Sequence, residues 1–312
     1  MERYQHLNNY FKNKFGERTL KICVDGGFTC PNRDGTVSTG GCIFCSAKGS
    51  GEHLKSAKNI ASQVKKQIDY KKERANQFIV YFQNFTNTYD SLENLKRKYD
   101  AALIDSRIVA LSIATRPDCI TEEIAKLLSS YMPRYTVLVE LGLQTTDENI
   151  LKHLNRGYAN DKFIEAVKIL RKYGIEVIAH MMMGLPFEND DSIQNTVEFL
   201  NSCDIQGIKI HSCYIVEGTK LAQMYKDGDY QPVTLEYYLE KLAYIITHLR
   251  PDIIIHRISG DAPKDLLLAP EWNLHKKWVL NGIDKILKEQ DLYQGMYYNK
   301  KSQTIKAGLP QI

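Results

Sequence analysis

Residues 30–45 read CPNRDGTVSTGGCIFC, and this short stretch contains Cys30, Cys42 and Cys45, three of the seven cysteines of the chain. A disulfide uses two cysteines, and a closed structural zinc site uses four ligands. Three thiolates, two of them in the tetrapeptide CIFC, therefore suggest a metal site that keeps one coordination position open.

The composition and the N-terminus favour a cytoplasmic protein. The chain has 312 residues, of which 43% are hydrophobic, and a net charge of +4 from 41 basic and 37 acidic side chains. That charge is too small to indicate nucleic-acid binding and does not exclude it. The N-terminus is polar and basic, and no run of about 18 apolar residues occurs. We therefore expect no membrane anchor and no disulfides, and we expect the reduced cysteines to serve metal or catalytic roles.

Strand-like and helix-like stretches alternate along most of the chain. Helical patterns such as 161–174, which ends in glycine, separate the strands, and Thr121 precedes an acidic first turn as an N-cap does. Six β–α units in a row predict an α/β protein with a parallel sheet, covered on both faces. The expected strands are apolar runs at residues 20–25, 78–83, 107–115, 136–144, 175–184 and 207–216.

The regular alternation of strand-like and helix-like stretches changes after residue 217. Residues 234–249 form an amphipathic helix pattern, 252–259 a short strand pattern and 276–291 another helix pattern. We therefore predict a core at residues 1–217 and a C-terminal α/β extension at residues 218–312 that packs on this core.

Polar residues gather where the predicted strands end. Glu140 and Gln144 lie four positions apart and face one side of their strand. The strands also end in FQNFTNT (82–88), ATRPD (114–118) and HMMMGLP (180–186). In β/α barrels the carboxyl ends of the strands build the active site. The cysteine stretch follows the first strand, so we expect it at the same rim.

This constellation resembles the radical S-adenosylmethionine (SAM) superfamily. Within it, the chain looks closest to a bacterial group related to the Elongator catalytic subunit, and more distantly similar to the oxygen-independent coproporphyrinogen dehydrogenases. Cys30 and Cys42 are further apart than in the usual CxxxCxxC motif, and a long first gap is a feature of the Elongator-like branch. The motifs that carry the resemblance are TRPD, VELGLQ, NRGY, GLP and IVEGT, followed by RISGDAP, LLLAPEW and QGMYY.

The resemblance implies a partial (β/α)6 TIM-like barrel, a [4Fe–4S] cluster and SAM. Cys30, Cys42 and Cys45 would bind three irons, and the amino and carboxylate groups of SAM would chelate the fourth. One electron from the cluster, supplied by an external donor of the flavodoxin or ferredoxin type, would release a 5′-deoxyadenosyl radical. Gly35, Gly40 and Gly41 let the backbone fold closely around the cluster.

The resemblance also assigns SAM contacts one residue at a time. Gln83 to Thr88 matches the segment that holds the methionine amino group, and Arg156 matches an arginine that pairs with the SAM carboxylate. Ala114 replaces a glutamate that binds the ribose in relatives, so Thr115 or Glu140 is expected to take its place. The full expected set is Phe44, Gln83, Thr86, Asn87, Thr115, Glu140, Gln144, Arg156, His180 near the ribose and Gly184 near the adenine.

Each assignment has a structural alternative. Arg156 can cap a helix or pair with an acid, His180 can be a core histidine, and Glu140 can form an ion pair inside the barrel. Residues 181–183, three methionines, are expected to pack the core. A zinc site is the alternative for the cysteine stretch, formed by Cys23, Cys30, Cys42 and Cys45.

The remaining cysteines, Cys119, Cys203 and Cys213, are expected to be small buried residues. Cys213 ends a predicted strand, so it is also a candidate hydrogen-atom donor.

The Elongator-like relatives modify the wobble uridine of tRNA with a carbon fragment from acetyl-CoA. Residues 218–312 contain no recognisable acetyl-CoA loop, so we predict a tRNA substrate without that donor route. Alternatives are a radical reaction on a small organic molecule and a haem carrier of the porphyrinogen branch. The basic residues proposed to meet tRNA phosphates are Lys12, Lys14, Arg18, Lys21, Lys300, Lys301 and Lys306.

Overall fold

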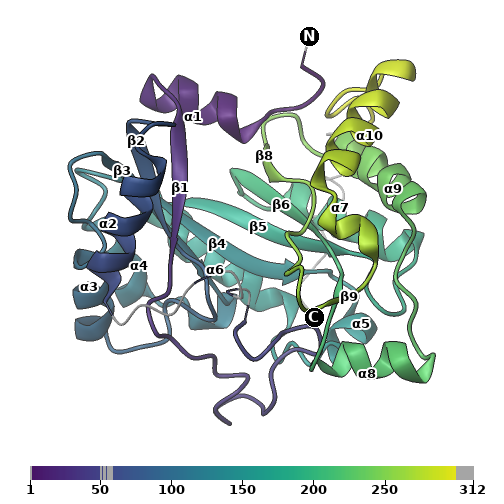
Figure 1. Cartoon of the computed structure of the whole chain (residues 1–312), viewed down its shortest axis with the longest axis horizontal. Helices are drawn as coiled ribbons and strands as arrows, with labels where there is room; N and C mark the ends of the chain where they lie inside the picture. The colour runs from purple at the N-terminus through teal and green to yellow at the C-terminus, as the bar shows by residue number, and fades with distance from the viewer. Residues whose placement is uncertain (1, 50, 52–53, 55–58, 300–312) are drawn as a thin grey trace, which may run out of the picture.

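A curled sheet of seven parallel strands forms the centre of the molecule in the computed structural model, which describes residues 2–49, 51, 54 and 59–299 (Figure 1). The sheet is a partial barrel, so the predicted (β/α)6 TIM-like architecture is confirmed, with a seventh strand added by the C-terminal extension. The strands, in sheet order, are β1 (Thr19–Val24), β2 (Gln77–Phe82), β3 (Ile108–Thr115), β4 (Thr136–Gln144), β5 (Glu176–Met183), β6 (Gly207–Ser212) and β8 (Ile254–Arg257).

Helices connect the strands and cover the outer face of the sheet (Figure 1). Several begin at side-chain caps, and Thr121 accepts a hydrogen bond from the Ile124 N–H as predicted. The helices between the first six strands are α2 (Ile60–Lys71), α3 (Leu92–Asp100), the short η1 (Pro117–Cys119), α4 (Glu122–Ser129), α5 (Glu148–His153), α6 (Asn160–Lys172) and α7 (Asp190–Ser202).

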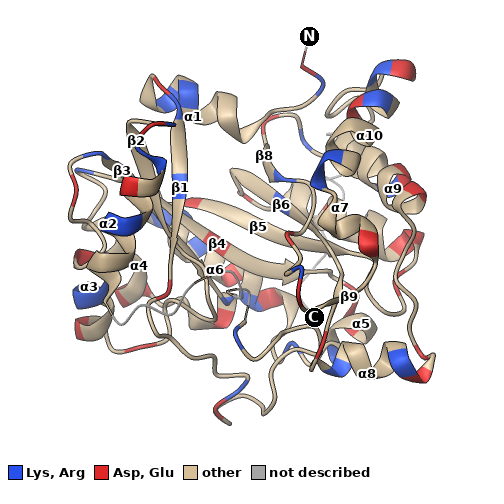
Figure 2. Ribbon diagram, in the orientation of Figure 1, with Lys and Arg blue, Asp and Glu red and all other residues tan. Residues whose placement is uncertain are grey.

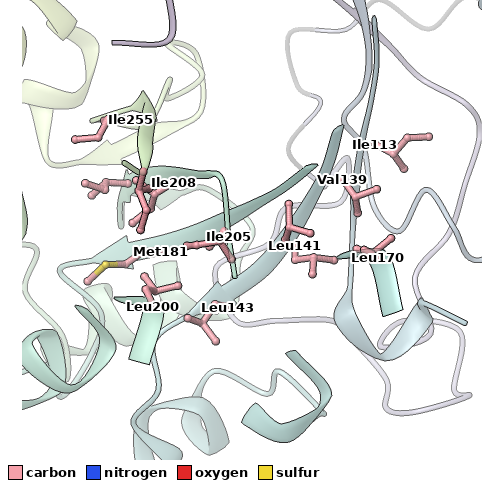
Figure 3. Close-up of a cluster of buried hydrophobic side chains, with 14 of the residues drawn as sticks. Ile113, Val139, Leu141, Leu143, Leu170, Met181, Leu200, Ile205, Ile208 and Ile255 are labelled. Carbon is pink, nitrogen blue, oxygen red and sulfur yellow. The ribbon is translucent and has the colours of Figure 1, made fainter. Parts of the chain in front are cut away.

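The main hydrophobic core lies between the sheet and these helices. Outward-facing side chains such as Val139 and Leu141 belong to the same buried cluster as Leu170 of α6 and Leu200 of α7 (Figure 3). Of residues 181–183, the first and third methionines are buried in this cluster, as predicted, and the second lies against a smaller one. Successive strand residues alternate between faces, so the polar residues of the strands point into the barrel.

The helix α1 (Leu7–Phe15) closes the barrel at the amino ends of the strands. Phe11 is buried in a cluster with inward-facing residues of four strands, Ile79, Ala110, Leu138 and Ile178. The loop that follows β1 lies at the opposite end (Figure 1). The interior of the barrel is therefore approached from the carboxyl ends of the strands.

The C-terminal segment adds β8 to the sheet edge and a small antiparallel pair beside it. The strand expected at residues 207–216 is divided, because Cys213 N–H bonds to Met183 and the chain then leaves the sheet to form β7. The buried Gln294 side chain connects this edge to the N-terminal segment. It accepts a hydrogen bond from Gln5 N–H and donates one to Ile253 O. The elements here are β7 (Ile215–Val216), α8 (Lys220–Asp227), α9 (Leu235–His248), β9 (Leu267–Ala269), η2 (Glu271–Leu274) and α10 (Lys276–Glu289). No helix in the described ranges is both long and apolar enough to span a membrane.

Candidate active site

The cysteine loop runs from β1 across the carboxyl rim of the sheet. Two backbone N–H groups, of Arg33 and Asp34, donate to Cys30 O at 2.8 and 3.2 Å, and Cys45 N–H donates to Cys42 O at 3.0 Å. Burial, together with the neighbouring thiols of Cys45 and Cys30, raises the pKa of the Cys42 thiol to about 12. The three predicted ligands are therefore electrostatic neighbours, held in two tight backbone turns.

The NRGY segment, residues 155–158, holds this loop in place through hydrogen bonds, which we call the NRGY clamp. Asn155 Nδ2 donates to Gly41 O at 2.9 Å, and Ser38 Oγ donates to Asn155 Oδ1 at 3.2 Å. Asn32 Nδ2 donates to Asn155 O at 2.5 Å. Gly157 has a φ of +82°, and an added Cβ there would lie 2.7 Å from the Asn32 side chain. Residues far apart in sequence thus fix the path of the cysteine loop.

Arg156 is buried beneath this clamp and binds backbone oxygens. Its guanidinium donates to Leu143 O at 2.8 Å, twice to Tyr158 O at 3.0 and 2.7 Å, and to Asn160 Oδ1 at 3.1 Å. Four of its five N–H groups are engaged in this way. Arg156 therefore forms neither the helix cap nor the acid pair named as its alternative, and its bonds within the chain favour a structural role over a direct salt bridge to the SAM carboxylate.

The TRPD segment, residues 115–118, contacts the NRGY segment through Arg116 and Tyr158. Its ring lies between two guanidinium groups, with Arg156 Cζ 4.1 Å and Arg116 Cζ 4.7 Å from the ring centroid. Arg116 also forms a two-pronged ion pair with Asp118 and donates to Arg156 O at 2.9 Å. Tyr158 OH donates to Gly142 O at 2.6 Å, which connects the stack to β4.

Gln144 lies across the end of β4. Its φ is +64°, and the β4–β5 register shifts just before it, so the strand ends in a bulge. A Cβ added to Gly142 would lie 2.7 Å from Gln144 Nε2, so the amide folds back over this glycine. The bulge and the glycine together place the amide over the interior of the barrel, the side predicted for it.

The loop after β2 is packed beneath the cysteine loop. Thr86 N–H donates to Thr29 O at 3.2 Å, and Asn87 Nδ2 donates to Ala114 O at 2.7 Å. Thr115 Oγ1 lies 2.6 Å from Thr88 Oγ1. The adjoining Gln83 is half-buried at the end of β2. Four buried oxygens along these loops have no hydrogen-bond partner among the described residues: Asn32 Oδ1, Asn84 Oδ1, Thr86 Oγ1 and Asn87 Oδ1.

Unpartnered buried polar atoms are uncommon in proteins, and these lie on the cysteine loop and on the loop after β2, which bonds to Thr29 beside Cys30. Soft thiolates are the usual ligands of iron–sulfur clusters. The donor set and the polar oxygens therefore fit a cluster with a polar molecule bound beside it.

Gly184 and its neighbours form another part of the rim. Gly184 N–H donates to Glu188 Oε2 at 2.5 Å, and Gly184 O accepts from Tyr230 OH at 2.5 Å. Burial raises the pKa of Glu188 to about 8. A Cβ at Gly184 would lie 3.0 Å from Val233, so the backbone is closely covered on one side. Phe44 is half-buried against the same small cluster as Leu185.

One side chain from each of six strands forms a polar layer inside the barrel. Glu140, fully buried, accepts from Lys21 Nζ, Ser112 Oγ and His180 Nε2, each at 2.8 Å, and from Lys209 Nζ. Lys209 Nζ also donates to Tyr81 OH at 3.2 Å. We call this set the interior polar layer: Lys21, Tyr81, Ser112, Glu140, His180 and Lys209.

These contacts favour the ion-pair alternative for Glu140 over a ribose contact. Burial opposes ionisation of Glu140, but the Lys209 and Lys21 ammonium groups outweigh it and hold the pKa of this carboxyl well below its ordinary value. Burial lowers the pKa of His180 to about 4, so the imidazole is neutral. His180 remains partly exposed toward the interior.

Cys23 lies apart from the cysteine loop. Burial raises the pKa of its thiol, and its charged neighbours are Lys71 and the lysines of the interior polar layer, with no loop cysteine among them. In the described chain, no three His, Cys, Asp or Glu side chains converge as ligands of a single metal ion. All seven cysteines are free thiols, and Cys203 and Cys213 are buried as expected, whereas Cys119 is half-buried.

The basic residues proposed to contact tRNA do not surround the rim. Figure 2 shows the basic positions of α1 at the end of the sheet opposite the cysteine loop. Lys14 forms an ion pair with Glu176, and Lys21 points into the barrel toward Glu140. Lys12 and Arg18 are exposed at the α1 end. Lys21 is therefore not a surface phosphate contact, whereas contact of tRNA with Lys12, Lys14 and Arg18 stays a prediction. Residues 300, 301 and 306 lie outside the described part of the chain.

Several site residues escaped the sequence prediction. Asn32, Asn155 and Tyr158 connect the loops, and only the folded chain shows their contacts. Lys21 and Lys209 could have been identified from the sequence, because each is a charged residue within an otherwise apolar strand segment.

This cysteine loop on the rim of a parallel partial barrel defines a radical SAM protein. The family description "Radical SAM superfamily" matches residues 32–200, more than half of the chain, and "Radical_SAM C-terminal domain" matches residues 205–289. The chain therefore belongs to the radical SAM superfamily, an enzyme family that uses a [4Fe–4S] cluster and SAM. Within it, the chain is 37% identical to "Uncharacterized protein YtqA" of Bacillus subtilis over 96% of this chain and 94% of that protein. It is 34% identical to "Protein YhcC" of Escherichia coli K12, over 91% and 94%.

More distant matches include tRNA-modifying proteins. The chain is 32% identical to the "tRNA uridine(34) acetyltransferase" of Methanocaldococcus jannaschii over 57% of this chain and 32% of that protein. The solved structure of Methanocaldococcus infernus Elp3 superposes with a TM-score of 0.66 at 20% identity, covering 88% of this chain and 64% of that one. The structural match supports the fold, and the sequence match covers only about a third of the longer relative.

Proposed function

We propose that Cys30, Cys42 and Cys45 hold a [4Fe–4S] cluster that cleaves SAM reductively, and that the enzyme modifies the wobble uridine of tRNA. The observation that carries the proposal is the cysteine loop itself, clamped by Asn155 beside a group of unpartnered buried oxygens. When bound, the cluster and SAM supply a 5′-deoxyadenosyl radical. The chain's own residues position these groups and exclude water.

The rim residues divide into contact and positioning roles. We propose that Gln83, Thr86, Asn87 and Thr115 surround the methionine end of SAM, because their segments pack directly beneath the cysteine loop. We further propose that Phe44, Gln144 and Gly184 line its remaining length, with His180 below.

We propose that Arg156 acts indirectly, by holding other residues of the site in place. Its bonds to Leu143 O and Tyr158 O hold the end of β4 and the NRGY segment in place, and these carry Gln144 and the clamp. We therefore assign Arg156 a positioning role, and Glu140 a role in the interior polar layer. We keep residues 1–217 as the catalytic core and residues 218–312 as an extension that supplies the edge strand β8.

The tRNA assignment is supported by the M. jannaschii relative, which is named as a tRNA uridine(34) acetyltransferase. An anticodon-loop base is nearly free of pairing and can enter a barrel rim. Because the match covers 32% of that relative, its acetyltransferase activity does not transfer to this chain. We propose a cytoplasmic location and a flavodoxin- or ferredoxin-type electron donor, which fit reduced thiols and a one-electron reaction.

A radical reaction on a small organic molecule is the second candidate. It is favoured by the charged interior polar layer, which lies inside the barrel where only a small group reaches, and by the distance of the α1 lysines from the rim.

The test uses anaerobically reconstituted protein with SAM, a reduced flavodoxin and tRNA from a strain that lacks the gene. We expect 5′-deoxyadenosine to form, and nucleoside mass spectrometry to show a wobble uridine converted in that tRNA. Cys42→Ala protein is the matched control and should convert none. SAM cleavage without any change in tRNA nucleosides would contradict the tRNA assignment and leave the small-molecule candidate.

A further inference from the structure

The interior polar layer contains two lysines and one carboxylate, so it carries more positive than negative charge whenever both lysines are protonated. Lys21 and Lys209 both contact the single carboxylate of Glu140, whose remaining acceptor positions are filled by Ser112 and His180. One lysine is enough to neutralise this carboxylate. Because burying an unpaired charge is costly, a second buried ammonium needs another explanation than packing.

The groups around the interior polar layer do not neutralise the positive charge of this second lysine. Arg257, from β8, is a further cation that acts on Lys209, and it pairs with Asp261 at 2.7 Å. The neighbouring imidazoles of His180 and His211 are kept neutral, since burial lowers the pKa of each. The His211 Nε2 atom is buried without a hydrogen-bond partner in the described chain.

The layer lies between the carboxyl ends of the strands and the cluster around Phe11. The cluster around Phe11 closes the barrel on the other side of the layer. The side chains of Lys21 and His180 nevertheless remain 19% and 18% exposed, and Lys209 remains 6% exposed. Part of each side chain is therefore accessible to a small molecule that enters the barrel.

We propose that the interior polar layer is a substrate subsite that binds an oxyanion, a carboxylate or a phosphate, through Lys209 and Lys21. This inference rests on the proposed function, because it places the anionic group of the substrate beneath the SAM site. Ammonium groups that already lie on the aromatic face of Tyr81, at 4.3 and 4.9 Å from the ring centroid, are held in place before the anion arrives.

The ionisation of Lys209 gives the subsite a measurable pH dependence. Burial, Lys21 and Arg257 lower the pKa of Lys209 to about 7, although Glu140 opposes them. The pKa values of Tyr81 and Cys23 are raised, and those of Glu140, His180 and His211 are lowered, each by burial or by the lysines. Lys209 is therefore the group whose charge changes between pH 6 and 8, and the anion should bind its protonated form.

The experiment is calorimetric titration of the anaerobically reconstituted, SAM-bound protein with sodium acetate and with sodium dimethyl phosphate. Neither probe changes its charge between pH 6 and 8, and chloride holds the ionic strength constant. The variant is Lys209→Met, which removes the surplus charge and keeps the volume. Lys241→Met is the matched control, because it makes the same substitution at a lysine of α9 that pairs with Asp190 outside the layer.

We expect at least one probe to bind the wild-type protein about tenfold more tightly at pH 6 than at pH 8, the change in protonated fraction for a pKa near 7. Lys209→Met should lose most of this binding, and Lys241→Met should keep it. Binding of acetate alone indicates a carboxylate substrate, and binding of dimethyl phosphate indicates a substrate that carries a phosphate group.

The inference is overturned if neither probe binds at pH 6, or if binding is independent of pH. It is also overturned if Lys209→Met binds as the wild type does. Iron content and SAM cleavage are measured on the same samples. Their loss counts against the proposed function, whereas normal values with no anion binding count against the subsite alone.

Discussion

Asn32 Nδ2 lies 3.7 Å from the sulfur of Cys42, within reach of a weak N–H···S hydrogen bond. The Asn32 side chain is fully buried, and its second amide hydrogen is directed to Asn155 O. The NRGY clamp therefore orients a hydrogen-bond donor toward one proposed cluster ligand. Hydrogen bonds to cluster sulfurs are one of the levers by which proteins set the reduction potential of iron–sulfur clusters.

Asn32→Leu should make the reduction potential of the reconstituted cluster more negative, because an N–H donor stabilises the electron-rich reduced state. A redox titration followed by electron paramagnetic resonance measures this shift. Ser38→Ala is the control, since it loosens the same clamp without touching the sulfur. An unchanged potential in Asn32→Leu with an intact cluster would show that the contact has no electronic effect.

Gly142→Ala should weaken SAM binding while the cluster still assembles. The new Cβ would occupy the space of Gln144 Nε2, which lies at the far end of a flexible side chain and can be displaced. Binding titrations of Gly142→Ala, Gln144→Ala and the double variant measure the coupling. We expect the two effects to overlap strongly. Fully additive losses would mean that Gly142 does not act through Gln144.

Arg156→Met should lower the free energy of unfolding by about 2–5 kcal/mol, because it leaves buried carbonyl oxygens without donors. Urea denaturation measures this change. The control is Arg107→Met, whose partly exposed pair with Asp105 should matter by about 1 kcal/mol or less. Wild-type stability combined with a loss of SAM affinity would instead restore the direct contact with the SAM carboxylate.

His180→Gln should reduce the loss of stability on acidification. Unfolded His180 takes up a proton below its ordinary pKa of 6.5, whereas the folded residue does so only below a pKa of about 4. The unfolded state therefore binds the extra proton between these values, and stability falls as the pH falls, by about 3 kcal/mol for this residue over the window.

Denaturation curves at pH 7 and pH 4.5 for His180→Gln, the wild type and His153→Gln test this. His153 lies on the exposed side of α5, so His153→Gln is the matched substitution outside the barrel. If His180→Gln loses stability on acidification as steeply as the wild type, His180 is not a buried neutral imidazole.

The fold could be predicted from the sequence because apolar strand segments and amphipathic helices alternate with short connections. Thr121 acts as the predicted N-cap, and the strand ends carry the predicted polar segments to one rim. The split of residues 207–216 into β6 and β7 could not be predicted, because an apolar run does not reveal where a chain leaves its sheet.

The candidate site was predicted only in part, because a sequence indicates positions along strands better than it indicates the partners of side chains. Position along a strand indicates which rim a residue reaches, so the cysteine loop and Gln144 were placed correctly. It does not indicate which partner a long side chain will find. Arg156 meets backbone carbonyls and Glu140 meets two lysines, and both outcomes depend on tertiary contacts.

Iron and sulfide content after anaerobic reconstitution is the measurement that tests the central claim most directly. Cys30→Ala, Cys42→Ala and Cys45→Ala should each lose the [4Fe–4S] cluster and SAM cleavage, because each removes one of the three thiolate ligands. Cys23→Ala, whose thiol lies among the interior lysines, should retain both. A normal cluster in any of the first three variants, or its loss in Cys23→Ala, would contradict the assignment.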